Sequence, residues 1–384
     1  MPGPFDILHI DSERGFRGGE SQLLYLAAHL RGRGCANTIA CPAGSALETE
    51  ARRQGFATLV LPFWTDFDPV SAWKLRRFAG EAARASGRRT ILHAHTGHAA
   101  GIAALAAADG LPWVAHRRVD FPLRGPLGRL KYRSAARIVA VSGSIRAVLE
   151  AAGLPAARIA VIPDCIPLTE EEARTAGLAA GPLRPATGEE RTALRGLLES
   201  EYGIPAEAPL VGNLAALVPH KDQATLLRAA ALVLRRLPEA RFVILGDGPL
   251  RSELEGLVSS LGIRTAVLLP GRQPDPKPWL RSLDLYVQSS WGEGMGSVIL
   301  EAMACRIPVA ATRAGGIPEV VTDGTSGRLA PPRDPQALAE TILDSLQDGP
   351  AARRRAQAAG EALERFGLAR LGDEMFKVYE EAAG

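Results

Sequence analysis

The sequence predicts an α/β protein with two doubly wound parallel-sheet domains. The chain has 384 residues, more than one hydrophobic core usually supports, so two domains are expected. Short apolar runs alternate with longer amphipathic stretches, which is typical of parallel strands that are buried on both faces and connected by helices. The alternation stops at the polar segment Thr169–Glu190 and then starts again. We therefore expect one sheet on each side of this segment.

The expected strands follow the apolar runs in order. Between them we expect helices, among them Ser21–Arg33 and Ile145–Ala152. The expected strands of the first half are Ile7–Ile10, Thr38–Cys41, Thr58–Leu61, Thr90–His93, Trp113–Ala115, Ile138–Val141 and Ile159–Ile162. Those of the second half are Leu210–Leu214, Phe242–Leu245, Val267–Leu269, Leu285–Val287 and Val309–Ala311.

The domain boundaries follow from the polar segment, which is rich in Gly, Pro, Ala and Glu and has no sustained apolar periodicity. This composition indicates a linker or an inserted loop. We expect an N-terminal domain over 1–168, the linker over 169–200, a C-terminal domain over 201–352 and helices that close the fold over 353–384. Because ligands of doubly wound sheets bind at the carboxyl ends of the strands, we expect the two domains to face a cleft that holds the site.

Composition excludes several classes of protein. The chain is 46% hydrophobic and 23% charged, with a net charge of +3, so its overall charge does not indicate nucleic-acid binding. We see neither a signal peptide nor an apolar run of about 18 residues, and we expect a cytoplasmic protein. The four cysteines are scattered without C-x-x-C spacing, which favours buried free thiols over disulfides or a zinc site.

The strongest chemical signal is the segment Glu293–Ala304, in which Glu293 and Glu301 are separated by seven residues. Gly294 and Gly296 let the backbone approach a ligand closely because they carry no side chain. A helix that begins near Gly296 directs free N–H groups and the positive end of its dipole at a diphosphate. Glu301 could then accept hydrogen bonds from a ribose diol, and Glu293 could bind sugar hydroxyls. An isolated glutamate is more simply a solvated surface charge, but the whole string favours binding.

Further motifs occur along the chain in a fixed order. They are Arg17-Gly18-Gly19-Glu20 after the first strand, Ile91-Leu92-His93-Ala94-His95, Val141-Ser142-Gly143-Ser144, Ile162-Pro163-Asp164, Lys221 after Gly212, Gly246-Asp247-Gly248-Pro249 and Gly315-Gly316-Ile317-Pro318-Glu319. Together with the E-x7-E segment, this ordered set resembles the retaining glycosyltransferases of family four, which have the GT-B fold of two Rossmann-like domains. The resemblance extends from about Phe5 to Tyr379.

The resemblance implies a reaction in which the nucleotide diphosphate leaves and an acceptor hydroxyl attacks the same face of the sugar. Catalysis then consists mainly of positioning and of stabilising the leaving diphosphate, for which Lys221 is the expected main cation. Neither a metal nor a cofactor is implied. The implied donor site comprises Gly18, Gly19, Lys221, Gly246, Arg272, Glu293, Gly294, Met295, Gly296, Ser297, Val298 and Glu301.

The sequence departs from the family pattern at the phosphates. Ala216 stands where an arginine usually accompanies the lysine. We expect another cation to replace that arginine. The candidates are His220, Arg272 and an arginine of the N-terminal domain, Arg117 or Arg118.

Three further departures concern other parts of the chain. Cys165 and Arg306 each stand where the family has glycine. The usual active-site histidine falls on Arg118, with His116 two residues earlier. Arg118 and His116 are therefore the catalytic candidates of the N-terminal domain, beside Lys221 and Glu293 in the C-terminal domain.

Two other patterns have a weaker meaning. Asp66-Phe67-Asp68 has the D-x-D form of a metal–diphosphate site, but it lies far in sequence from the nucleotide motifs, and we expect a plain acidic loop. The stretch from Trp113 to Arg146 contains eight basic residues and one acid, Asp120. Such a stretch suits an anionic acceptor or an anionic membrane surface, and it is equally well explained as a solvated basic face. The basic residues are Arg117, Arg118, Arg124, Arg129, Lys131, Arg133, Arg137 and Arg146.

We therefore predict a metal-independent, retaining glycosyltransferase of cell-envelope or extracellular glycan synthesis. Its expected partners are a nucleotide-sugar donor and a glycan or glycolipid acceptor, at the inner face of the membrane or in the cytoplasm, without nucleic acid. Alternatives are another GT-B enzyme, namely a sugar-nucleotide epimerase or a pyridoxal-dependent phosphorylase, or a non-catalytic glycan-binding protein. Lys221, Glu293 and Glu301 argue against the non-catalytic protein, and Ala216 argues mildly for it.

Overall fold

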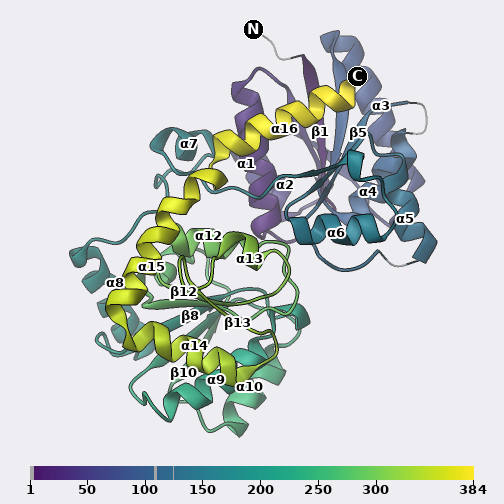
Figure 1. Ribbon diagram of the computed structural model, residues 1–384. Helices are drawn as coiled ribbons and strands as arrows, with labels where there is room; N and C mark the ends of the chain where they lie inside the picture. The colour runs from purple at the N-terminus through teal and green to yellow at the C-terminus, as the bar shows by residue number, and fades with distance from the viewer. Residues whose placement is uncertain (1–3, 108–109, 124) are drawn as a thin grey trace. The chain divides into compact units, whose positions relative to one another are not determined.

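The computed structural model describes residues 4–107, 110–123 and 125–384. The chain divides into two compact units (Figure 1): unit 1 contains Met1–Pro182 and Phe366–Gly384, and unit 2 contains Leu183–Arg365. Each unit is built on one parallel sheet that helices cover. The predicted fold class of two doubly wound parallel-sheet domains is thereby confirmed.

Unit 1 contains, among its described residues, a seven-stranded sheet with the order β3-β2-β1-β4-β5-β6-β7. Every residue of β1 is buried, as expected for a strand covered on both faces. The strands are β1 Phe5–Ile10, β2 Asn37–Pro42, β3 Ala57–Leu61, β4 Arg89–Ala94, β5 Trp113–Arg117, β6 Arg137–Ala140 and β7 Ile159–Val161. The helices are α1 Gly18–Gly32, α2 Ala46–Arg53, α3 Pro69–Ser86, α4 Gly97–Ala106, α5 Gly125–Arg133, α6 Gly143–Ala151, η2 Ala156–Arg158, α7 Glu170–Thr175 and α16 Leu368–Ala383.

Unit 2 contains, within the described part of the chain, a six-stranded sheet with the order β10-β9-β8-β11-β12-β13. Its core lies where α9 and α14 pack against the sheet. The strands are β8 Leu210–Leu214, β9 Arg241–Leu245, β10 Val267–Gly271, β11 Leu285–Gln288, β12 Val309–Thr312 and β13 Arg328–Ala330. The helices are α8 Gly188–Tyr202, η3 Pro219–Lys221, α9 Gln223–Leu234, α10 Arg251–Ser260, α11 Lys277–Ser282, α12 Ser297–Ala304, α13 Ile317–Val320, α14 Pro335–Gln347, α15 Gly349–Glu361 and η4 Ala362–Phe366.

The structure differs from the expected linker over 169–200, because two helices form there. Thr169 caps α7, and Thr187 and Glu190 form a capping box at the start of α8. The boundary between the units falls between Pro182 and Leu183, inside this segment. Only Arg195 and Leu198 of α8 are buried, so the sequence lacked the apolar stripe that usually indicates a helix.

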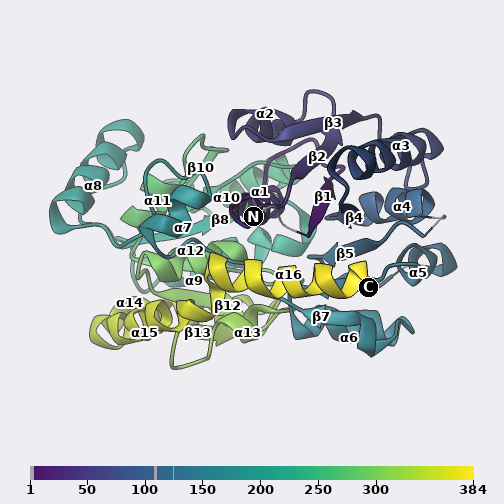
Figure 2. The same cartoon turned by 90° about the horizontal axis from the view of Figure 1, so that it is seen from above.

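The closing helices over 353–384 are divided between the two units. Helix α15 packs on α12 in unit 2, whereas α16 returns to unit 1 and contacts α1 and strands β4 to β6. Figure 2 shows α16, in yellow, running along unit 1. Leu368, Leu371, Met375 and Tyr379 recur at helical spacing and are buried in the core around Phe5. α16 therefore forms part of the core of unit 1.

Two simpler expectations were also tested. All four cysteines are buried and free, as the spacing of the thiols predicted. Among the described helices, none combines the length and the apolar character that crossing a bilayer requires.

Arg306 explains one glycine of the family pattern. Helix α12 ends in a Schellman motif, in which Arg306 N donates to Met303 O at 3.0 Å and Ile307 N donates to Ala302 O at 2.9 Å. Arg306 lies at the left-handed position of this motif with φ +52°. Cys165, by contrast, has no positive φ, so its backbone does not require glycine.

We expect Arg306→Gly to raise the free energy of unfolding by about 1 kcal/mol, because glycine removes the strain of a left-handed residue. Urea unfolding measures the change. Arg354→Gly, in the middle of α15, is the control and should lower the free energy of unfolding by about 1 kcal/mol. A loss of stability in Arg306→Gly would mean that the hydrogen bond from Arg306 to Gln357 outweighs the strain.

Candidate functional site

Two loops of unit 2 meet where the strand order of its sheet reverses. Strands β8 and β11 are neighbours, but the chain leaves β8 towards β9 and leaves β11 towards β12. The connections diverge, which leaves room for a ligand at the carboxyl ends of β8 and β11. Lys221 follows β8 and Glu293 follows β11, so both predicted residues lie at this switch point.

Lys221 and Glu293 form an ion pair, with 2.5 Å between Nζ and Oε2. Their side chains are 20% and 10% exposed. The same carboxylate oxygen accepts hydrogen bonds from Gln288 Nε2 at 2.9 Å and from Ser290 Oγ at 3.0 Å. In this structure Glu293 is therefore the anion that pairs with Lys221.

Residues that the sequence reasoning missed hold this pair in place. Ser289 Oγ donates to Lys221 O at 2.9 Å, and Trp291 N donates to His220 O at 2.9 Å. The buried Tyr286 hydroxyl hydrogen-bonds to Gln288. The polar run Gln288-Ser289-Ser290 at the end of an apolar strand was the signal that could have revealed them.

The Gly246 loop lies at the same edge of the sheet. A Cβ on Gly246, whose φ is +133°, would lie 1.9 Å from Ala215 O, so only glycine fits there. Gly246 N donates to Gly271 O at 3.0 Å, and Arg272 follows directly as an exposed residue after β10. Arg272 is thereby two strands away from the loop that contains Ala216.

Helix α12 begins directly after the glycines that follow Glu293. Gly296 has φ +85°, and Ser297 is the first helical residue. Gly294 and Met295 are buried, whereas Ser297 and Val298 are half-buried. The first N–H groups of α12 lack acceptors within the helix, so they can bind an anion.

Glu301 lies more than one turn inside α12. Burial raises the pKa of its carboxyl to about 7, and the Lys277 ammonium opposes this shift. At neutral pH the carboxyl is therefore close to half-protonated.

In unit 1 the predicted glycines also follow a strand at a switch point, between β1 and β4. Gly18 and Gly19 begin α1, and the Glu20 carboxylate accepts a hydrogen bond from Arg17 N at 2.6 Å. A Cβ on Gly19 would lie 3.9 Å from Arg118 Cδ. The glycine loop thus lies against Arg118, although the two are about 100 residues apart in sequence.

Arg118 lies just after β5 and is 13% exposed. Its Nε donates to Asp164 Oδ1 at 3.1 Å, its Nη1 lies 3.3 Å from His95 Nδ1, and its Nη2 lies 3.5 Å from His116 Nδ1. His116 is 2% exposed and faces Arg118, and burial is the main reason that its pKa lies well below the usual value.

Arg117 is used inside unit 1. Its guanidinium donates to Phe121 O and, at 3.3 Å, to Tyr132 Oη. Of the two N-terminal arginines that could replace the family's phosphate arginine, Arg118 is thus the one at the strand ends beside the glycine loop.

Asp11, at the end of β1, is a titratable residue that the sequence reasoning missed. It is 1% exposed, and burial, with the nearby charge of Glu20, raises the pKa of its carboxyl to about 7. It accepts a hydrogen bond from Glu13 N at 2.8 Å. A carboxylate with a raised pKa at the end of a strand is a common feature of functional sites.

The basic stretch is largely paired within unit 1. Lys131 forms an ion pair with Asp66, Arg137 with Glu381 at 2.6 Å and Arg146 with Glu150 at 2.7 Å. Arg124 lies outside the described residues. These pairs favour a structural role for much of the stretch.

The D-x-D segment also has a structural role. Asp68 caps α3 by accepting from Val70 N at 2.9 Å, and it also accepts from Ser71 Oγ at 2.6 Å. Asp66 pairs with Lys131. The two carboxylates thus serve different partners.

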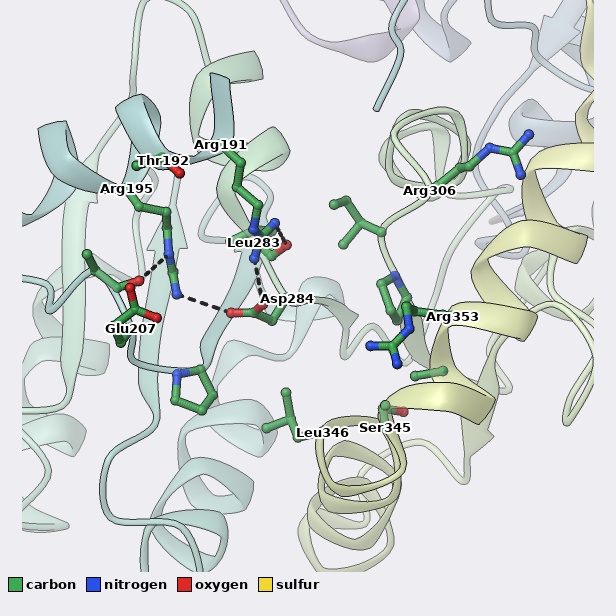
Figure 3. Close-up of a pocket in the computed structure, with 16 residues that line it drawn as sticks. Arg191, Thr192, Arg195, Glu207, Leu283, Asp284, Arg306, Ser345, Leu346 and Arg353 are labelled. Carbon is green, nitrogen blue, oxygen red and sulfur yellow. Dashed lines mark hydrogen bonds and ion pairs between the residues drawn. The ribbon is translucent and has the colours of Figure 1, made fainter. Parts of the chain in front are cut away.

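A cavity of about 630 Å³ lies at the amino ends of the unit 2 strands, where β8, β11 and β12 begin, and thus opposite to the carboxyl ends that hold Lys221 and Glu293. Figure 3 shows Arg191 and Arg195 directed at Asp284, whereas Arg353 points into the cavity and Arg306 away from it. Arg191 pairs with Asp284 at 2.5 Å and Arg195 at 3.3 Å. The cavity contains none of the predicted site residues.

Two family models match the chain, one in each half. The model described as Glycosyltransferase Family 4 matches residues 16–170, and the model described as Glycosyl transferases group 1 matches residues 197–362. Together they contain all the motifs from the Gly18 loop to Glu301.

Several curated proteins are similar to part of the chain. A D-inositol 3-phosphate glycosyltransferase of Thermobispora bispora is 33% identical over 203 residues, which are 50% of this chain and 47% of that protein. The lipopolysaccharide core biosynthesis glycosyltransferase LpsE of Rhizobium meliloti is 35% identical over 164 residues, 43% of this chain and 47% of its own length. The chain thus spans about half the length of these relatives.

Solved structures resemble the whole chain. Anabaena Alr3699/HepE in complex with UDP-glucose is similar with a TM-score of 0.82 and 23% identity, covering 98% of this chain and 99% of its own. A glycosyltransferase of Rickettsia africae gives a TM-score of 0.81 with 18% identity, covering 99% and 98%. At this level of identity the likeness concerns the fold.

Proposed function

Since the chain belongs to the family-four glycosyltransferases of the GT-B fold, we propose that it transfers a sugar from a nucleotide-diphosphate sugar to an acceptor hydroxyl. The observation that carries the proposal is the contact of Lys221 with Glu293 at the switch point of unit 2, directly before the start of α12. A cation, free helix N–H groups and close backbone approach are the features that bind a diphosphate.

We assign the donor contacts as follows. Lys221 exchanges its partner Glu293 for the diphosphate, whose negative charge grows as it leaves. The N–H groups from Gly294 to Ser297 bind the same phosphates, with Gly246 and Arg272 beside them. Glu301 accepts hydrogen bonds from the ribose diol, and Glu293, released from Lys221, binds hydroxyls of the sugar. In unit 1, Gly18 and Gly19 leave space for a ligand beside Arg118, which we propose as the catalytic cation of that unit.

The acceptor attacks the face from which the diphosphate leaves, so the configuration of the sugar is retained. This assignment is supported by the family alone. Relatives are named for inositol phosphate and for the lipopolysaccharide core, and we accordingly propose an acceptor of cell-envelope glycan or glycolipid synthesis, at the inner face of the membrane.

Binding of nucleotides tests the proposal without knowledge of the acceptor. In a thermal-unfolding panel of UDP, GDP, ADP and CMP, one nucleoside diphosphate at 100 times its Kd should stabilise the protein by about 2.7 kcal/mol. If neither these nucleotides nor their sugar derivatives shift the midpoint of thermal unfolding, the protein is not a nucleotide-sugar transferase.

Glu301→Ala should weaken binding of that nucleotide by about 1–3 kcal/mol, because it removes the acceptor of the ribose hydroxyls. Only the ionised carboxylate accepts both hydrogen bonds, and its pKa is about 7. The wild-type Kd should therefore rise about tenfold between pH 8 and pH 6. Isothermal titration measures both effects, and Glu301→Gln is the control for protonation of the nucleotide. Equal pH slopes in wild type and Glu301→Gln would remove Glu301 from the site.

Transfer should persist in excess EDTA, because Lys221 and the N–H groups of α12 replace a metal at the diphosphate. The assay compares donor turnover with and without the chelator. A complete loss of turnover that manganese or magnesium restores would contradict a metal-independent site and would favour a metal site at Asp66 and Asp68.

A further inference from the structure

We propose that two buried histidines, His95 and His9, fix the orientation of Arg118 and so act as positioning residues for sugar transfer. The inference rests on the proposed function, in which Arg118 is the catalytic cation of unit 1. It is carried by a chain of hydrogen bonds in which every donor and acceptor can be assigned.

The assignment starts at Arg118, because a guanidinium only donates hydrogen bonds. The imidazole nitrogens that face it must therefore be acceptors. These are His95 Nδ1, 3.3 Å from Nη1, and His116 Nδ1, 3.5 Å from Nη2. Asp164 Oδ1 accepts from Nε at 3.1 Å. Each nitrogen of the guanidinium thus faces an acceptor.

His95 then carries its proton on Nε2 and donates it to His9 Nδ1, 3.0 Å away. His9 in turn carries its proton on Nε2 and donates to Asn37 Oδ1 at 3.0 Å. Asn37 Nδ2 donates to Cys35 O at 2.9 Å. The hydrogen bonds therefore all donate in one direction, from Arg118 to the backbone at Cys35, and no polar side-chain atom of His95 or His9 is left unpaired.

The charge of Arg118 is oriented by this chain without being cancelled by it. Burial lowers the pKa of His9 to about 4 and the pKa of His95 well below its usual value, so both rings are neutral at pH 7. Two neutral imidazoles and one carboxylate, that of Asp164, surround the guanidinium. A cation held in this way is preorganised for a developing negative charge.

The same cluster has a second explanation as a metal site, since one nitrogen each of His9, His93 and His95 lie within 4.8 Å of one another. Two features argue against a metal. Both nitrogens of His9 and of His95 already have partners, and a divalent cation would lie beside a guanidinium. The metal site therefore enters the test as a competing outcome.

Two substitutions of His95 separate its hydrogen bonds. In His95→Asn, the amide oxygen can replace Nδ1 and accept from Arg118, whereas in His95→Gln the amide reaches the position of Nε2, towards His9. We expect His95→Asn to keep kcat within about fivefold of wild type and His95→Gln to lower it at least tenfold, with little change in donor KM. His93→Asn, near the end of β4 and also buried, is the control for the loss of a buried imidazole and should keep kcat.

A double-mutant cycle shows whether the effect passes through Arg118. In an Arg118→Ala background, His95→Gln should have no further effect on kcat. Equal kcat values for the Asn and Gln variants, or additive losses in the cycle, would contradict the positioning role. Melting temperatures of all variants identify any that fail to fold.

Nitrogen-15 NMR of the histidine side chains tests the chain even in the absence of transferase activity. His95 and His9 should both be neutral Nε2–H tautomers at pH 7. An Nδ1–H tautomer of His95 would overturn the inference, and shifts of His9, His93 and His95 on stoichiometric zinc would establish the metal site instead. If no nucleotide binds in the panel but both histidines are the expected tautomers, the proposed transferase function is refuted and the chain of hydrogen bonds from Arg118 to Asn37 is confirmed.

Discussion

Lys221→Met should lower kcat/KM for the donor by about 10²–10³-fold, because it removes the main positive charge from the leaving diphosphate. Methionine keeps the length of the side chain but neither donates nor carries charge. The variant also removes the ammonium that lies 2.5 Å from the Glu293 carboxylate, so the uncompensated charge of this carboxylate should repel the diphosphate. The loss is expected in kcat as well as in binding, since the charge on the diphosphate grows as it leaves.

Steady-state donor turnover measures this loss, and urea unfolding shows whether the fold is intact. Lys74→Met, at an exposed position of α3 in unit 1, is the matched control and should leave turnover unchanged. A Lys221→Met enzyme within threefold of wild type would exclude Lys221 from the diphosphate site.

The second large effect concerns stability in mild acid. Burial lowers the pKa of His9 to about 4 and the pKa values of His93, His95 and His116 well below 6.5. The unfolded chain therefore binds more protons than the folded chain as the pH falls below 6.5. Stability that is fully present above this pH is then lost on acidification, at up to about 1.4 kcal/mol per pH unit for each proton.

Two carboxyls oppose this loss. The pKa values of Asp11 and Glu301 are raised to about 7, so these groups bind protons in the folded state first and stabilise it as the pH falls below 7. Burial also lowers the pKa of His29, so five histidines against two carboxyls leave a net loss of stability between pH 6.5 and pH 4.5.

Urea unfolding at pH 7.0, 6.0 and 5.0 measures the slope. Asp11→Asn removes one opposing group and should make the loss steeper by up to about 1.4 kcal/mol per pH unit. A free energy of unfolding that stays constant or rises on acidification would mean that the five imidazoles are not held neutral.

The parts of the fold that depend on local pattern could be predicted from the sequence. Strands such as Leu210–Leu214 are continuous apolar runs, and their order followed from the alternation with helices. β13 (Arg328–Ala330) was not predicted, because only two of its three residues are apolar and they do not form an apolar run. The return of α16 to unit 1 was not predicted, because an apolar stripe on a helix does not indicate which of two cores the helix packs into.

The candidate site divides in the same way. Lys221 and Glu293 follow strands β8 and β11, so their approach at a switch point follows from topology. The neighbours of Arg118 could not be predicted from topology in this way. Gly19, His95 and Asp164 come from three different connections and meet only in the folded unit. The raised pKa of Asp11 likewise arises from burial, which composition does not reveal.

The most direct test of the central claim is a crystal structure with the nucleoside diphosphate that the panel selects. We predict that its diphosphate lies within hydrogen-bond distance of Lys221 Nζ and of the N–H groups between Gly294 and Ser297, with the ribose at Glu301. Binding in the arginine-lined cavity beside Asp284 and Arg353, at the amino ends of the unit 2 strands, would contradict the account.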